Sequence, residues 1–204
     1  MTSDARTPWT FRIALACGLL PLLVGTLIYA IFVGTENLLM MTFGLLNIYA
    51  GMALFVVGLV CTALYFFGER SRGVGQPKLG VRTTLLLAVL LINFPVAGAL
   101  AYSALDIATT YHVEVRNESD EPLTNLVLSA PSIELSSSAL PPGGEFQADL
   151  RFSGDGALML RYELAGEPRE EVIEGYVTGG WGGDALVVRR ADGTFSITTK
   201  SFGE

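Results

Sequence analysis

Residues 83–117 read TTLLLAVLLINFPVAGALAYSALDIATTYHVEVRN, and the character of the chain changes within this stretch. Its first 23 residues, 83–105, carry no charge, and about 20 apolar residues suffice for a helix to cross a bilayer core. From Tyr111 onward apolar and polar residues alternate, which is typical of a strand with one buried face. The stretch therefore predicts the junction between a membrane-spanning helix and a β domain.

Two further charge-free runs precede this junction. They cover residues 13–35 and 37–68, which are 23 and 32 residues long. The first run is longer than the apolar segment of a secretory signal, about 7–15 residues, so we expect it to stay as an anchor. We predict three transmembrane helices in a domain of residues 1–107. Their spans are about 11–33, 43–67 and 83–105.

Basic residues in the short connections predict the orientation of these helices. The tail before the first charge-free run contains Arg6 and Arg12, and the connection 69–82 contains four Lys and Arg residues. The connection at 34–37 contains none. Because positive residues stay on the cytoplasmic side, we expect a cytoplasmic N-terminus and a domain outside after three crossings. We predict a bacterial inner-membrane protein with a periplasmic C-terminal domain.

Residues 108–204 predict that extracytoplasmic domain as an all-β fold. Alternating apolar residues recur in several short segments, and Gly- and Pro-containing turn signals separate them. We expect seven or eight strands in an antiparallel β-sandwich of immunoglobulin-like type, without the disulfide of antibody domains. The inward positions are Tyr111, Val113, Val115, Phe146, Ala148, Leu150, Phe152, Leu158, Leu160, Tyr162, Leu164, Phe195, Ile197 and Thr199.

Composition limits the classes of ligand. The chain is 50% hydrophobic and 16% charged, with a net charge of −7. Residues 106–204 hold seventeen acidic and seven basic residues, so nucleic acid is not an expected ligand, whereas a dissolved cation or a basic protein remains open. Cys17 and Cys61 both lie in apolar runs and are interpreted as packing residues, which leaves no cysteine-based metal site in the β domain.

Candidate catalytic and metal-binding groups are few. His112 is the single histidine, and the strand alternation places it on the solvent face beside Glu114. Glu170, Glu171 and Glu174 flank apolar residues of a predicted strand, whereas calcium ligands are spaced around a loop. We therefore expect a solvated strand edge, and neither an enzyme, a metal site nor a cofactor.

The second span carries a packing signal. Glycines recur on one face every seven residues, and Asn47 shares that face. Small residues let a second helix approach closely, and an amide can form a hydrogen bond across the contact. The partner is either another span of this chain or another membrane subunit. The glycines on this face of the second span are Gly44, Gly51 and Gly58.

In the third span, Pro95 predicts a kink in the helix, close to Asn93.

Residues 175–184, GYVTGGWGGD, form the candidate partner-binding segment. Trp181 lies between two Gly-Gly pairs on a predicted loop, and Tyr176 is nearby. Tryptophan is enriched at binding hot spots, and its ring also suits lipid headgroups. In the alternative, the indole folds back onto the sandwich edge. The glycines are Gly179, Gly180, Gly182 and Gly183.

Two functional hypotheses follow. In the first, the helices anchor a periplasmic β-sandwich that binds a protein partner, as an accessory or assembly subunit of an envelope complex or as an immunity-type protein. In the second, the chain is an accessory subunit of a membrane transport or sensing complex. The charge-free runs offer no proton relay or ion pathway of their own, so transport would depend on other subunits.

Overall fold

The computed structural model describes residues 8–202. The chain divides into two compact units, residues 1–104 and 105–204, so the last turn of the third helix belongs to the second unit. Each unit contains its own cluster of buried apolar side chains.

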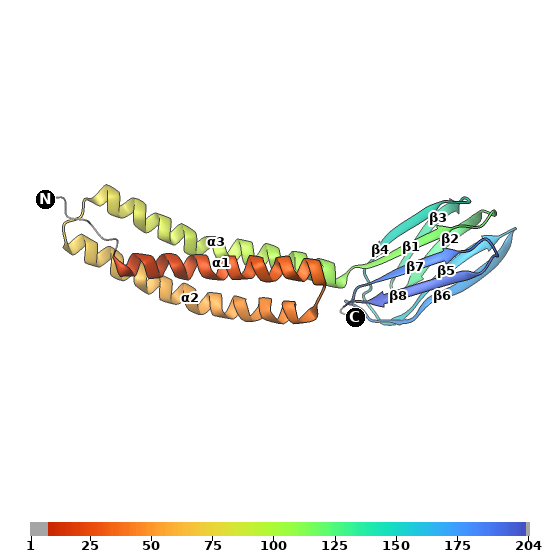
Figure 1. Ribbon diagram of the computed structural model, residues 1–204, viewed down its shortest axis with the longest axis horizontal. Helices are drawn as coiled ribbons and strands as arrows, with labels where there is room; N and C mark the ends of the chain where they lie inside the picture. The colour runs from red at the N-terminus through yellow and green to blue at the C-terminus, as the bar shows by residue number, and fades with distance from the viewer. Residues whose placement is uncertain (1–7, 203–204) are drawn as a thin grey trace. The chain divides into compact units, whose positions relative to one another are not determined.

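The first unit is built from three long helices (Figure 1). They are α1 (Trp9–Thr35), α2 (Leu38–Ser71) and α3 (Gln76–Thr109), and each has the length and composition needed to cross a membrane. Each predicted span lies inside one of them. The predicted connection 69–82 is shorter than expected because α3 already begins at Gln76 and continues past Lys78 and Arg82. Polar side chains beyond the apolar run can point outward and leave the helix intact.

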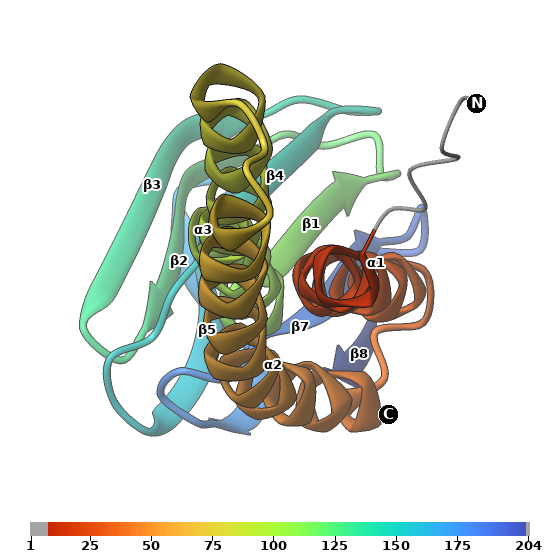
Figure 2. The same cartoon turned by 90° about the vertical axis from the view of Figure 1, so that its left-hand side faces the viewer.

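Helix α1 runs alongside α2 and α3 (Figures 1 and 2), and polar side chains of both helices contact it. The Asn47 amide of α2 donates to the Pro21 carbonyl at 3.0 Å. The Asn93 amide of α3 donates to the Gly18 carbonyl at 2.6 Å. These bonds cross-link the three helices near the middle of α1. A hydrogen bond of 2.6 Å between the hydroxyls of Tyr29 and Ser103 also joins α1 to α3.

The outer faces of the helices expose large apolar side chains along most of their length. The buried cluster of this unit is small and contains Ala14, Cys61, Tyr65, Leu79 and Leu86. Side chains more than half exposed include Leu23, Leu27, Tyr49, Val56, Val60, Leu64 and Leu91.

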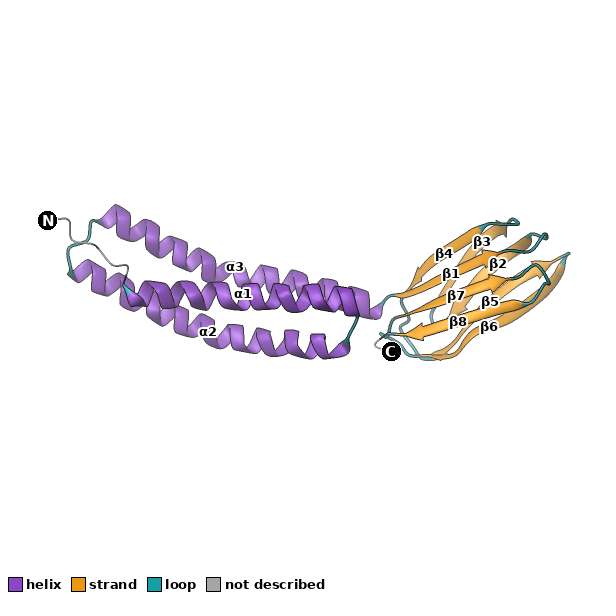
Figure 3. Cartoon of the chain, viewed as in Figure 1, coloured by secondary structure: helices purple, strands orange, loops and turns teal. Residues whose placement is uncertain are grey.

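The second unit contains eight strands in two four-stranded sheets (Figure 3). One sheet has the order β4-β1-β7-β8 and the other β3-β2-β5-β6. All pairings are antiparallel except that of β1 with β7. The strands are β1 (Tyr111–Asn117), β2 (Leu123–Ala130), β3 (Ile133–Leu140), β4 (Glu145–Leu150), β5 (Gly156–Leu164), β6 (Glu167–Val177), β7 (Gly183–Arg189) and β8 (Phe195–Ser201).

Side chains from both sheets form the core between them. Tyr111, Val113 and Val115 of β1 are all at most 2% exposed, which confirms the alternation predicted from sequence. The Tyr111 ring packs against Phe152, and Tyr162 packs against Phe195, both with centroids 5.4 Å apart. The prediction is wrong at Thr199, which is exposed on the edge strand β8 because no second strand covers it.

The strand order does not establish the immunoglobulin-like connectivity. In that arrangement the first two strands belong to one sheet. In this domain β1 lies inside one sheet, between β4 and β7, and β2 lies in the other. Gly154-Asp155-Gly156 has the composition of a hairpin turn, but it closes no hairpin because β4 and β5 belong to different sheets. Asp192-Gly193 does join the antiparallel neighbours β7 and β8.

Candidate functional site

The loop between β6 and β7 presents the candidate partner-binding residues. Trp181 is 46% exposed and Tyr176, near the end of β6, is 64% exposed. Val172 of β6 is also exposed. Apart from Leu105 in α3, these are the exposed large apolar side chains of the second unit within residues 105–202. All three therefore come from one strand and the loop that follows it.

Backbone hydrogen bonds attach this loop to the end of α3. The N–H of Gly182 donates to the carbonyl of Ala108, in the last turn of the helix, at 2.8 Å. The N–H of Gly183 donates to the carbonyl of Thr110 at 3.3 Å. On the other side, the Gly182 carbonyl accepts from the N–H of Phe202 at 3.1 Å. The loop is thus fixed to the point where the helix passes into β1.

Asp155 holds the first half of the loop. Its carboxylate accepts from the backbone N–H of Gly179 at 2.9 Å and from the Tyr176 hydroxyl at 3.0 Å. The hydrogen bond from Tyr176 to Asp155, and then the negative charge of the Asp155 carboxylate, raise the pKa of the Tyr176 phenol. One carboxylate therefore ties the exposed tyrosine to the loop that carries Trp181.

Each glycine of the loop has a structural reason to lack a side chain. A Cβ on Gly179 would lie 2.9 Å from the Gly154 nitrogen, and one on Gly182 would lie 2.8 Å from the Ala108 carbonyl oxygen. A Cβ on Gly183 would meet the Tyr111 ring at 2.8 Å. Gly180 has φ +76°, a left-handed conformation that glycine adopts without strain. The four glycines therefore build a closely packed loop.

Strand directions decide which loops share an end of the domain. Strand β1 begins directly after α3. Its neighbour β4 runs antiparallel to it, so β4 ends at the α3 end of the domain. Its other neighbour β7 runs parallel to it, so β7 starts at that same end. The connections β4–β5 and β6–β7 consequently meet there. The connections β1–β2, β3–β4 and β7–β8 lie at the opposite end.

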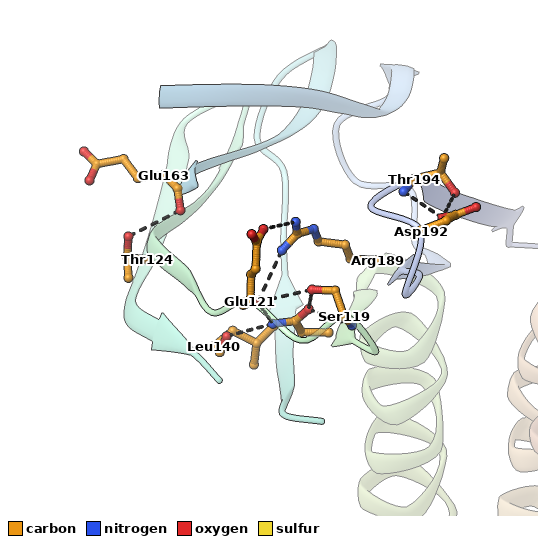
Figure 4. Close-up of polar contacts among 9 residues, drawn as sticks. Ser119, Glu121, Thr124, Leu140, Glu163, Arg189, Asp192 and Thr194 are labelled. Carbon is orange, nitrogen blue, oxygen red and sulfur yellow. Dashed lines mark hydrogen bonds and ion pairs between the residues drawn. The ribbon is translucent and has the colours of Figure 1, made fainter. Parts of the chain in front are cut away.

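The opposite end is built from polar contacts (Figure 4). Arg189 is 3% exposed, and its guanidinium donates to the Glu121 carboxylate at 3.0 Å and to the Glu121 carbonyl at 3.2 Å. The buried Asn117 amide donates to the carbonyls of Glu121 and Leu140 at 2.8 and 3.1 Å. Ser119 donates to the Asn117 side chain at 2.7 Å. These contacts close the loop between β1 and β2 over the core.

The other candidate groups are separated from one another. His112 is exposed, with Nδ1 2.6 Å from the Asp149 carboxylate. Glu170 pairs with Arg161 at 3.0 Å, whereas Glu174 accepts from the Tyr111 hydroxyl on the other sheet. No cluster of three metal-ligating side chains occurs in residues 8–202.

The helix-packing residues of α2 differ in their surroundings. A Cβ on Gly51 would lie 3.3 Å from Pro21 of α1. A Cβ on Gly58 would lie 2.5 Å from Leu90 of α3 and 3.2 Å from Cys17 of α1. Asn47 bonds to α1, as described above, so these three positions contact helices of the same chain. Gly44 has no neighbour within 4 Å of such a Cβ.

Sequence reasoning missed three contributors to the site. Asp155 lies in a turn, where an aspartate usually bonds to its own backbone two residues on, so its bond to Gly179, 24 residues away, has no local sequence signal. The carbonyls of Ala108 and Thr110 carry no sequence signal, because every residue has such an acceptor. Only the fold brings residues 108–110 to residues 182–183.

Comparison with known proteins leaves the family of this chain open. Neither a protein-family model nor a curated protein matches it. A protein from Eubacterium rectale solved by NMR is similar with 10% identity and a TM-score of 0.33, over 44% of this chain and 87% of that one. The N-terminal domain of AlgF from P. aeruginosa is similar with 13% identity and a TM-score of 0.28, over 46% of this chain and 95% of that one. At these TM-scores neither likeness supports a statement about function.

Proposed function

We propose that this chain is a non-enzymatic bacterial inner-membrane protein whose periplasmic β-sandwich binds a protein partner. The observation that carries the proposal is the half-exposed Trp181 on a rigid loop, with Tyr176 tied to it through Asp155. Aromatic side chains held in place bind with little loss of conformational entropy, and tryptophan and tyrosine dominate binding hot spots. The role is that of an accessory or assembly subunit of an envelope complex, or of an immunity-type protein.

The membrane placement is supported by the surfaces of α1, α2 and α3. Their outer faces expose far more apolar area than the patches of a few hundred Å² that soluble proteins tolerate. The basic residues of the connections favour a cytoplasmic N-terminus, and therefore a periplasmic sandwich. The same proposal treats the sandwich as immunoglobulin-like in one respect, namely that it binds its partner through loops at one end of the domain.

A second candidate function is an accessory subunit of a transport or sensing complex. Gly44 favours it, because this position of α2 is open to a further helix whereas Gly51 and Gly58 are occupied. Asn47, on the same face, already donates its amide to a carbonyl of α1. The part of this face that is open to another subunit is therefore the end of α2 around Gly44, close to its first residue, Leu38.

Photo-cross-linking in intact cells tests the partner proposal. A photoreactive residue at position 181 should give a specific protein adduct, and the same residue at the exposed turn position 192 should give none. Adducts of equal yield at both positions, or no adduct at position 181, would contradict a partner site at this loop.

A Trp181→Ala variant measures the strength of the contact. We expect it to weaken co-purification of the partner by about thirtyfold, since truncation of a hot spot costs roughly 2 kcal/mol. Because the ring is about half exposed, the free energy of unfolding should fall by only about 1 kcal/mol. A loss of about 3 kcal/mol, as for a buried aromatic residue, would identify Trp181 as a packing residue and retire the hot-spot proposal.

A further inference from the structure

The β6–β7 loop lies at a defined distance from the end of the third apolar run. The Gly182 N–H is bonded to Ala108, which is three residues beyond Leu105, where the charge-free run ends. A helix rises about 1.5 Å per residue, so Ala108 lies about 4.5 Å beyond that point along the axis. The headgroup layer on each side of the hydrocarbon core is about 5–8 Å thick. When residues 83–105 fill the core, the Gly182 backbone lies within this layer.

The attachment of the loop keeps Trp181 close to this level. Backbone bonds of 2.8 and 3.3 Å join Gly182 and Gly183 to residues 108 and 110. The Gly180 N–H donates to the Phe152 carbonyl at 3.0 Å, which fixes the preceding turn. Both neighbours of Trp181 are thus bonded to other segments of the domain.

The two ends of the sandwich differ in surface chemistry. At the α3 end the loop exposes Trp181, and Tyr176 is joined to it through Asp155. The opposite end carries the ion pair of Arg189 with Glu121, and the loops there expose no large apolar side chain within the described residues. Tryptophan and tyrosine are favoured at the lipid headgroup level because their rings have both apolar and polar parts. The exposed aromatic residues occur at the end that faces the membrane if α3 crosses it.

We propose that Trp181 and Tyr176 bind the lipid headgroup layer and so hold the sandwich against the membrane. This inference rests on the membrane anchoring of the proposed function, but it requires no protein partner. Because the domain is strongly acidic, zwitterionic phosphatidylcholine suffices and anionic lipid adds nothing. A protein that binds the same patch must then reach it at the membrane surface, which restricts the partner to membrane proteins.

Tryptophan fluorescence of the full chain in vesicles tests this proposal. The chain contains two tryptophans, Trp9 and Trp181, so a Trp9→Phe variant reports on Trp181 alone. In phosphatidylcholine vesicles we expect lipids brominated near the headgroup to quench its emission about twofold, because the ring lies within that layer. Lipids brominated near the chain ends should quench it less, and aqueous iodide should quench it weakly.

A matched control places the tryptophan at the opposite end of the same domain. The triple variant Trp9→Phe, Trp181→Phe, Ala191→Trp carries it at the exposed β7–β8 turn. It should be quenched strongly by iodide and not by brominated lipid. If Trp181 in the Trp9→Phe variant behaves like this control, the headgroup proposal is overturned and the partner proposal stands with a water-facing patch.

A third variant separates this failure from failure of the membrane anchoring. Trp181→Phe leaves Trp9, which is exposed at the start of α1 and should lie in the headgroup layer of the other leaflet. If brominated lipid quenches neither Trp9 nor Trp181, and the protein does not float with the vesicles, the membrane anchoring is wrong and the proposed function with it.

Discussion

Gly182 lies where the β6–β7 loop touches the backbone of the junction between α3 and β1. A Cβ at this position would collide with the carbonyl oxygens of Thr110 and Ala108, and backbone atoms cannot move aside cheaply. We predict that Gly182→Ala lowers the stability of the β domain by about 1–3 kcal/mol, the cost of inserting a methyl group into a packed site. The melting temperature of the full chain in detergent, followed by near-ultraviolet circular dichroism, measures the effect.

Gly175→Ala provides the control for this prediction. Gly175 lies in β6, only seven residues away, and its Cβ would meet nothing within 4 Å. This substitution should change the stability by less than about 0.5 kcal/mol. Equal losses of stability in both variants would contradict the close packing of the loop at Gly182.

On the scale of elements, α2 packs against its neighbours at Gly58 and leaves Gly44 open. A Cβ on Gly58 would lie 2.5 Å from Leu90 and 3.2 Å from Cys17. We predict that Gly58→Val separates the helices and lowers the resistance of the bundle to unfolding in sodium dodecyl sulfate by about 1–3 kcal/mol. Gly44→Val should leave that resistance unchanged.

The same pair of variants bears on the second candidate function. If Gly44 contacts a further subunit, Gly44→Val should abolish co-purification of that subunit while the bundle stays intact. If Gly44→Val destabilises the bundle as much as Gly58→Val does, the helices pack differently from the arrangement described above.

At the scale of the whole molecule, we predict that residues 105–204 fold without the helices. Their core lies between the two sheets, and the described residues of the unit contain no cysteine that would need a partner elsewhere. The fragment should be a soluble, β-rich monomer by far-ultraviolet circular dichroism and sedimentation. A spectrum dominated by helix or by disorder would refute the independent fold.

A shorter fragment, residues 109–204, serves as its matched comparison. It lacks the Ala108 carbonyl that accepts from Gly182 and the Asp106 carboxylate that pairs with Arg151. We expect it to fold as well, with a stability lower by about 1–2 kcal/mol, since a net hydrogen bond contributes roughly 1 kcal/mol and an exposed ion pair less. The difference measures how firmly the last turn of α3 belongs to the domain.

The orientation of the chain is also a property of the whole molecule. The tail and the connection 69–82 hold six basic residues, and the connection at 34–37 holds none. Alkaline phosphatase is active only outside the cytoplasm, so a fusion after Glu204 should be active and a fusion within residues 72–78 inactive. The reverse pattern would place the β domain in the cytoplasm.

Local patterns in the sequence were sufficient to predict the three helices and several of the strands of this protein. Charge-free runs longer than a bilayer core predicted the three helices, and the period of two predicted the buried faces of β1, β4 and β5. These features depend on residues close in the chain, so they are visible without a fold. The glycine-rich surroundings predicted a loop at Trp181 but left open whether its indole is exposed, and the fold leaves it 46% exposed.

Only the tertiary structure decided which segments meet. The attachment of Gly182 to Ala108 and the bonds from Asn47 and Asn93 to α1 join residues that are 26 to 75 positions apart, and the order of the strands was likewise set by the fold. Such contacts depend on how whole sheets and helices pack, and the acceptors are backbone carbonyls that every residue possesses. The sequence by itself therefore determined the helices, several of the strands and a loop at Trp181, whereas the packing left that tryptophan exposed at the α3 end of the domain.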